Sequence, residues 1–510
     1  MQGSPILRDR GGRVSNAVQI FSKVGEAIVK RNERLAFGAF EFDTVRSLLF
    51  RGGVPVALGR RGGALLAFML KHRGEVLTKA DLMDAAWPGL SVEEANLSVQ
   101  ISQLREVLGS GWITTLPRVG YRFRPAVESQ RNRFVAPTVS IVPFADFETG
   151  AQAHADGFAE DLATALGRFR SLTVVGDEAA EAGYALQGSV RRIGECLRVN
   201  VRLIDRTGGA HLWAETADLA VDGARADWLV RRVAGSVDAA IQHAETSHSQ
   251  ARRPASTRPY DLYLRARSHL RSSEEGDNAL AYGLLQQALE MEPENVHVLA
   301  AMVETLHHRD SVGWPSIGAD DRGHARDLAL RGLALGGDDA AAIGLFAEAL
   351  FSAGEYDIAR LVAERAVEIN PGSSMALVCA GLGSLWLIDT DRAQDYNERA
   401  HALGVADPNQ RFALNGMSAV QRRRGNYEVA AELARRALAA GPALSAAHWN
   451  LIASTVCLGR LDDARRQMTR YRALSPSATI ATIRRGQRIV DERVRERFLG
   501  LLAEAGLPEA

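Results

Sequence analysis

Residues Arg60–Arg124 read RRGGALLAFMLKHRGEVLTKADLMDAAWPGLSVEEANLSVQISQLREVLGSGWITTLPRVGYRFR, and this stretch decides the fold of the N-terminal part of the chain. Apolar residues recur within it at the spacing of one helical face, at Leu97, Ile101, Leu104 and Leu108. Such a stripe must be buried against a core. We therefore expect a helix here whose opposite face is free to contact something else.

Two shorter helical segments precede this helix, and a hairpin follows it. The first runs over about residues 62–73, and Thr78 is a favourable N-cap for the second, Lys79 to Ala86. Residues 112–116 are rich in β-branched side chains, and 121–123 supply a partner strand. Three helices followed by a hairpin indicate a DNA-binding unit with a β-wing.

The helix segment VQISQLR (99–105) and the hairpin strand GYRF (120–123) together resemble the winged helix-turn-helix effector domain of OmpR-type response regulators. The resemblance covers roughly Leu35 to Pro125. It implies a small antiparallel sheet over Leu35 to Leu58, ahead of the helices, and it implies binding to duplex DNA. The segment before the module, residues 1–34, is too short for a receiver domain, so we expect no control by aspartyl phosphorylation in cis.

The face opposite the apolar stripe carries small and neutral polar side chains. Asn and Gln can read adenine edges in the major groove, and a small apolar group can touch a thymine methyl. Arg118 stands at the hairpin tip, where a cation can meet a phosphate or enter the minor groove. The flanking Pro117 and Val119 depart from the glycines frequent in this family. The predicted DNA-binding residues are Asn96, Val99, Gln100, Ser102, Gln103, Arg105, Arg118, Tyr121 and Arg122.

The composition of the 510-residue chain sets further bounds. Its length predicts about three or four domains. The formal net charge is zero, so no global field attracts it to nucleic acid or membrane. Its three cysteines are far apart and match no metal spacing, as in a reducing compartment. With no apolar run of membrane-spanning length and no signal-peptide pattern, we expect a soluble cytoplasmic protein without cofactor.

From Thr138 the pattern becomes α/β. A buried strand, an amphipathic helix and further strands follow one another up to about residue 219. The motifs VPF (142–144), GSVRR (188–192) and HLWAE (211–215) are similar to the TolB-N-terminal-like or FlgO-like domain, which implies a binding or assembly module without catalysis. The acidic residues Glu160 and Asp161 are better explained as complements to a helix dipole than as a catalytic pair.

The C-terminal half contains an internal repeat. Four glycines are each followed 17 positions later by a proline: Gly276 and Pro293, Gly354 and Pro371, Gly425 and Pro442, Gly459 and Pro476. Asp391 and Pro408 keep this spacing with Asp in place of Gly. This is the tetratricopeptide pattern, in which the glycine permits a tight turn between two helices and the proline stops the second helix. We expect about six repeats that stack into a solenoid.

Two irregular stretches accompany the repeats. Thr305 to Asp320 is predicted to be a loop inserted between repeats one and two, and Ser477 onward is predicted to be a capping helix. The concave groove of such an array is expected to bind a protein or peptide partner, although the array could also serve only for dimerisation or as a spacer.

The predicted fold is therefore multidomain: a winged helix (α+β), a small α/β domain and an all-α tetratricopeptide solenoid. The predicted divisions are an extension at 1–34, the winged domain at 35–126, a linker at 127–137, the α/β domain at 138–250 and the repeats at 255–510.

No P-loop, nucleophile elbow, Rossmann glycine run or zinc spacing is present, so we expect no enzyme. The leading hypothesis is a one-component transcriptional regulator that binds double-stranded DNA and has no membrane partner, with a homodimer on DNA as one arrangement to test. The alternative is a non-catalytic interaction scaffold whose winged domain binds protein. A relative of nucleotide cyclases is a third possibility, because the middle and repeat domains can accompany cyclase domains.

Overall fold

The computed structural model describes residues 34–37, 40–43, 47–51, 54–72, 77–88, 92–109, 112–116, 120–123, 134, 136–146, 152–176, 182–220, 226–252, 256, 258–272, 274–404 and 407–510. The chain divides into two compact units, Met1–Arg133 and Phe134–Ala510. The extension predicted at residues 1–34 lies outside the described residues, apart from Arg34.

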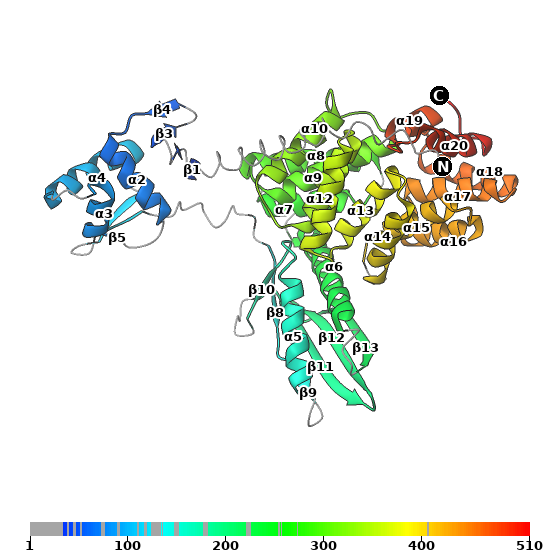
Figure 1. The fold of residues 1–510 in the computed structure, drawn as a ribbon, viewed down its shortest axis with the longest axis horizontal. Coiled ribbons are helices and arrows are strands. Elements are labelled where there is room, and N and C mark those ends of the chain that lie inside the picture. Colours follow the sequence, from blue (N-terminus) through cyan, green and yellow to red (C-terminus); the bar gives the residue numbers. More distant parts are fainter. Residues whose placement is uncertain are drawn as a thin grey trace, which may run out of the picture. The chain divides into compact units, whose positions relative to one another are not determined.

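The described residues of the N-terminal unit form two small sheets and the helices α2, α3 and α4 (Figure 1). The first sheet is antiparallel, with strands in the order β1 (Arg34–Phe37), β2 (Phe40–Asp43), β3 (Leu48–Arg51) and β4 (Val54–Val56). The helices are α2 (Arg60–Lys71), α3 (Lys79–Ala86) and α4 (Glu94–Leu108). The second sheet has the order β5 (Leu77–Thr78), β7 (Gly120–Phe123), β6 (Ile113–Leu116). The predicted order of sheet, three helices and hairpin is confirmed.

Local signals place these elements where the sequence predicts. The Thr78 side chain accepts a hydrogen bond from the Asp81 amide, and the Asp81 carboxylate accepts one from the Thr78 amide, which forms a capping box at the start of α3. The apolar stripe of α4 is buried in the core of the unit, as predicted, at Leu97, Ile101, Leu104 and Leu108. The opposite face of α4 is thereby turned outward.

The second unit begins with an α/β domain. Its sheet has the order β10 (Thr173–Val175), β8 (Thr138–Ile141), β11 (Tyr184–Ile193), β12 (Cys196–Asp205), β13 (His211–Ala220), and the short β9 (Ala145–Asp146) also pairs with β11. Two helices, α5 (Gln152–Leu166) and α6 (Ala226–Arg252), pack with this sheet around one core. Phe144 lies over Gly188 of β11, where a Cβ atom would be 2.3 Å from the ring.

Helix α6 is the element that the sequence analysis did not assign. Its apolar residues recur at helical spacing and are buried at Leu229, Val233, Val237 and Ile241. That periodicity was available in the sequence. The helix also contacts the repeats: a Cβ atom at Gly235 would lie 3.2 Å from the Gly372 carbonyl oxygen. At the same boundary, Arg170 forms an ion pair with Asp338.

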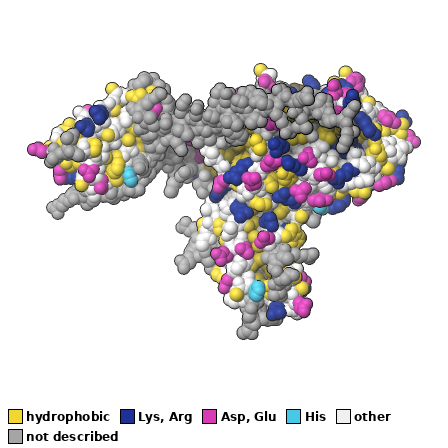
Figure 2. All heavy atoms as spheres, in the orientation of Figure 1, with side chains coloured by type: hydrophobic (Ala, Val, Ile, Leu, Met, Phe, Trp, Pro, Cys, Tyr) yellow, Lys and Arg dark blue, Asp and Glu magenta, His cyan; other side chains and the backbone are white. Residues whose placement is uncertain are grey.

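The repeats are six helix pairs, as predicted. They are α7 (Pro259–His269) with α8 (Glu275–Met291), α9 (Val296–Val312) with α10 (Asp321–Ala334), α11 (Ala340–Ser352) with α12 (Tyr356–Ile369), α13 (Ser374–Trp386) with α14 (Thr390–Ala402), α15 (Gln410–Arg423) with α16 (Tyr427–Ala440), and α17 (Ser445–Cys457) with α18 (Leu461–Leu474). Figure 2 shows basic and acidic side chains interspersed over the visible face of these helices.

Glycine makes the turn in three of the pairs. Gly354, Gly425 and Gly459 have φ of 85°, 85° and 74°, in the left-handed region that glycine adopts without strain. The equivalent turn before α14 is made by Ile388, with φ of 65°, so the predicted role of Asp391 is wrong. Gly276 lies inside the first turn of α8 and makes no turn either.

The predicted insertion at Thr305 to Asp320 is also wrong. Helix α9 continues to Val312 and ends at Gly313, whose φ of 79° caps it, so only the residues after it form a loop. This loop lies within the second pair, between α9 and α10. Helix α9 is longer than the repeat pattern predicts, because no helix-breaking residue precedes Gly313.

The segment after the sixth pair does more than cap the array. It contains two helices, α19 (Ile480–Gly486) and α20 (Glu492–Glu504), rather than the single predicted one. Helix α20 packs against α17, as Figure 1 shows in red beside orange, while α19 contacts α9 of the second pair. A Cβ atom at Gly486 would lie 2.5 Å from the Ser311 carbonyl oxygen, so the approach to α9 is close. The C-terminal segment therefore joins the last repeats to the early ones.

The stretch predicted to be a linker also contributes contacts. The Phe134 ring stacks on His297 with ring centroids 5.1 Å apart, and it meets Tyr260 edge-on at 4.8 Å. Its backbone amide donates to Glu292 at 2.6 Å. Phe134 thus anchors the start of the second unit on the first repeats.

Candidate nucleic-acid interface

The outward face of α4 carries four of the nine predicted DNA-binding side chains. Asn96, Ser102 and Gln103 are exposed on it. Val99 lies among them with 53% of its surface exposed, so this face offers one apolar contact between polar ones. A helix with this surface can enter a major groove, because its polar groups can bond base edges while the valine meets a thymine methyl. Ser98 is exposed on the same helix and was not predicted.

The side chain of Gln100 points toward α2 and Gln103 rather than directly into solvent. Its Nε2 donates to Gln103 Oε1 at 2.9 Å, and its Oε1 would lie 3.6 Å from a Cβ atom at Gly62 of α2. It is half-buried. This arrangement orients the side-chain amide of Gln103. Gln100 is thus placed to position Gln103, whose contact with DNA remains a prediction.

Arg105 and Tyr121 connect α4 to the hairpin. The Arg105 guanidinium donates to the Ile113 carbonyl at 2.8 Å and to the Thr115 hydroxyl at 2.7 Å. It also lies 6.0 Å from the ring centroid of Tyr121, which is 7% exposed and part of the core. In the free protein these two side chains brace the wing against the helix, and their predicted contact with DNA remains a prediction.

The hairpin itself has regular pairing. Ile113 faces Phe123 and Leu116 faces Gly120 across the antiparallel pair. The tip that contains Arg118 lies outside the described residues, as does the side chain of Arg122. Since Arg122 is opposite Thr114 in the register, the backbone places it on the wing strand itself.

The start of α4 is held to α3 by an exposed ion pair. Lys79 Nζ lies 2.6 Å from Glu94 Oε2, and the hydrogen bond and charge of Glu94 raise the pKa of Lys79. The hydrogen bonds from Thr78 lower the pKa of Asp81. Glu93 is also exposed at this end, so carboxylates near the N-terminus of α4 would repel phosphates and restrict how the helix docks.

Other candidate sites are weaker. Among the described residues, no group of three His, Cys, Asp or Glu side chains is placed to hold a metal ion. None of the described helices combines the length and apolar character needed to cross a bilayer. The three cysteines, Cys196, Cys379 and Cys457, are free thiols.

Comparison with known proteins identifies the N-terminal module. Residues 53–123 match the family described as "Transcriptional regulatory protein, C terminal", and these residues are a domain of that family. The match spans α2, α3, α4 and the hairpin, which are the elements that present the face described above.

Two relatives extend the comparison. The chain is 21% identical over 369 residues to the transcriptional regulator HilA of Salmonella typhimurium, which covers 67% of this chain and 66% of HilA. It is 28% identical over 180 residues to putative adenylate cyclase 3 of Rhizobium meliloti, which covers 31% of this chain and 30% of the relative. The chain thus matches less than two thirds of the length of either.

Two solved structures resemble parts of the chain. One comes from the functional characterisation of Pseudomonas aeruginosa pilF, at 16% identity and a TM-score of 0.30, covering 48% of this chain and 96% of that one. The other is a tetratricopeptide repeat protein from Parabacteroides merdae, at 16% identity and a TM-score of 0.29. The match covers 48% of this chain and 98% of that protein's chain.

Proposed function

We propose that the chain is a transcriptional regulator that binds duplex DNA through the outward face of α4 and the β6–β7 wing. The observation that carries this proposal is the face itself: neutral polar side chains around an exposed Val99, on a helix whose other face is fixed in the core. The family of residues 53–123 and the similarity to HilA support the same conclusion.

The repeat array would then supply the regulatory input. The α/β domain and the repeats form one compact unit, so a signal bound by the repeats would reach the α/β domain through direct contacts. Two copies of the chain could present two winged domains to half-sites about one helical turn apart. Each domain alone binds weakly, and linkage raises the effective concentration of the second.

The test is electrophoretic mobility shift and footprinting on genomic fragments with the full chain. We expect protected sites, and we expect the triple substitution of Asn96, Val99 and Gln103 by alanine to relax the sequence preference. Arg470→Ala, on the exposed face of α18 in the repeats, is a control that should leave the footprints unchanged. A full chain that shifts no duplex at low salt would contradict the proposal and favour the scaffold hypothesis.

A further inference from the structure

The repeat array and the C-terminal segment line a cavity of about 400 Å³ that is partly open to solvent. Most of its lining comes from α9, α11, α13, α15 and α17, while Arg271 lines it just after α7, and the C-terminal segment contributes Gly486, Gln487, Ile489 and Phe498. A volume of this size lies in the range of pockets that bind small molecules.

The C-terminal segment is fixed where it crosses this side of the array. Arg488 Nε donates to the Ser352 carbonyl at 3.1 Å, and its guanidinium forms an ion pair with Asp310. The Val490 amide donates to the Trp386 carbonyl at 3.0 Å. An extended peptide running along the groove would have to displace these contacts. The cavity beside this segment is therefore better suited to a small ligand than to an extended peptide.

The two carboxylates that line the cavity already have cationic partners. Glu304 forms an ion pair with Arg267, and Glu348 Oε1 lies 3.1 Å from His307 Nε2. Four arginines also line the cavity, and none of them forms an ion pair with any described residue: Arg271, Arg411, Arg422 and Arg423. The walls thus carry an excess of positive charge.

Two of these arginines, at the far end of α15, each donate to a neutral acceptor, although the buried Nε of Arg423 has no acceptor among the described residues. Arg422 donates to Asn450 Oδ1 at 3.2 Å, and Arg423 donates to the Leu385 carbonyl at 2.6 Å. Arg411 lies at the start of α15 and differs from these two arginines. Within the described part of the chain, its guanidinium has no hydrogen-bond acceptor. It contacts the Phe412 ring, with its central carbon 4.7 Å from the ring centroid.

The backbone is shaped to admit the Arg411 side chain. Gly441 follows α16, and a Cβ atom there would lie 2.5 Å from Arg411 Cδ. Burial lowers the pKa of Arg411, and burial together with the charges of Arg267 and Arg411 lowers the pKa of Arg271. Burial and the charges of His307 and Arg411 lower the pKa of His308 to about 4, which keeps this neighbour neutral.

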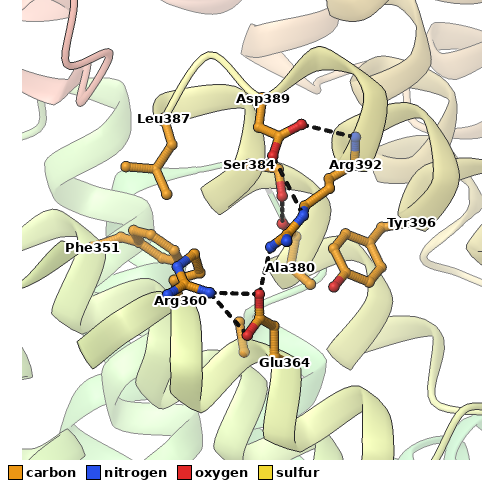
Figure 3. A pocket seen from close by; sticks show the side chains of 10 residues that line it. Phe351, Arg360, Glu364, Ala380, Ser384, Leu387, Asp389, Arg392 and Tyr396 are labelled. Atoms are coloured by element: carbon orange, nitrogen blue, oxygen red, sulfur yellow. Dashed lines mark hydrogen bonds and ion pairs between the residues drawn. The ribbon is translucent and has the colours of Figure 1, made fainter. Parts of the chain in front are cut away.

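A smaller hollow in the array shows the opposite arrangement (Figure 3). It has a volume of about 20 Å³, room for about one water molecule. There Arg360 and Arg392 both lie against Glu364, at 2.9 Å and 2.6 Å. These arginines neutralise a carboxylate of their own chain, so that hollow needs no ligand. In the large cavity no described carboxylate forms an ion pair with Arg411, and Glu304, whose charge acts on Arg411, is already paired with Arg267.

We propose that the large cavity binds a small organic anion, whose acidic group is held by Arg411 with Arg271 and whose apolar body lies along Val378, Leu382 and Trp386. A carboxylate and a phosphate share the chemistry that this end of the cavity recognises. An anion of this kind would be the signal in the proposed function. Its binding to the cavity does not depend on that function, and only its effect on DNA binding rests on it.

Calorimetric titration of the full chain tests the binding directly, without DNA. The probes are 4-phenylbutyrate, its neutral analogue 4-phenylbutanol and its cationic analogue 4-phenylbutylamine, with phenyl phosphate to separate a carboxylate from a phosphate preference. We expect at least one acid to bind about tenfold or more tightly than the alcohol and the amine, because a charge-assisted pair is lost in both. If no probe binds, or if the alcohol binds as tightly as the acids, the proposal is overturned.

The variant Arg411→Gln should weaken acid binding by about tenfold or more, whereas Arg470→Gln, on the exposed face of α18, should not. If Arg411→Gln does not fold, Gly441→Ala decides, because it displaces the Arg411 side chain and keeps its charge. Unchanged acid affinity in the folded variant rejects the assignment. Loss of DNA binding with acid binding intact would count against the proposed function alone.

Discussion

Arg105 of α4 holds Thr115 of β6: the guanidinium Nη2 lies 2.7 Å from the threonine hydroxyl and 2.8 Å from the carbonyl oxygen of Ile113. One side chain thus fixes the angle between the helix proposed to read the major groove and the wing beside it. A DNA-binding surface built from two elements depends on such a brace, because both must dock together.

We predict that Arg105→Gln loosens the wing. Hydrogen bonds from a charged group contribute about 1.5–3 kcal/mol each, so the winged domain should lose stability on that order. Hydrogen–deuterium exchange of the full chain should then show faster exchange over Ile113–Leu116. Glu106→Gln, exposed on the same helix, is the control. Unchanged exchange over this strand in the Arg105 variant would refute the bracing role.

The proposed division between base reading and phosphate contact gives a second prediction. Arg118→Ala or Arg122→Ala should weaken binding to all duplexes alike and reduce the slope of log affinity against log salt by about one. Gln103→Ala should instead reduce discrimination at one base position, by about 1–3 kcal/mol. Titrations at several salt concentrations separate the two effects. A Gln103 variant with a reduced salt slope and intact preference would argue against α4 as the reading element.

Two helical glycines in the repeats should respond oppositely to the same substitution. At Gly332 of α10 a Cβ atom would lie 2.2 Å from the Phe346 ring, so Gly332→Ala should destabilise the array by about 1–3 kcal/mol. At Gly283 of α8 nothing lies within 4 Å, so Gly283→Ala should stabilise it by about 0.5–1 kcal/mol. Thermal unfolding measures the change in Tm of each variant relative to the unmodified chain. Equal changes in Tm for the two variants would show that α10 does not pack closely on α11.

The boundary between α6 and the repeats should be sensitive to pH. Burial, together with the charges of Asp339 and Asp407, raises the pKa of Asp238 to about 7 against the opposing effect of the hydrogen bond from Ser171. The folded protein therefore keeps a proton that the unfolded chain releases near pH 4. The stability contributed by Asp238 is fully present below that pH and is lost as pH rises through 7, by up to about 1.4 kcal/mol per pH unit.

We expect Asp238→Asn to remove this dependence. Thermal unfolding of the full chain and the variant, compared between pH 5 and pH 8, measures the difference. Compared with the unmodified chain, the variant should gain stability at pH 8 relative to pH 5. The reason is that at pH 8 the unmodified chain must bury a charged carboxylate, and the variant does not. The exposed Asp463→Asn serves as the control. Parallel pH profiles for Asp238→Asn and the unmodified chain would contradict the prediction.

Much of the architecture follows from local patterns. The stripe from Leu97 to Leu108 predicts the orientation of α4, and the capping sequence at Thr78 predicts where α3 begins. The glycine and proline spacing predicts the helix pairs, because three of the six carry a glycine that makes their turn. The mistakes arose where the spacing alone was used: at Asp391 the turn belongs to Ile388, three positions earlier.

The sequence by itself determined the winged domain, the helical repeats and the exposed residues of α4, since each depends on residues a few positions apart, whose spacing fixes which face is buried. Only the tertiary structure decided that Arg105 binds the wing strand, that the segment around Arg488 closes the array, and that Arg411 lies in the resulting cavity. These contacts join residues distant in the chain, except for Arg105. Whether an arginine meets a carbonyl, a carboxylate or an empty space depends on packing that periodicity does not encode.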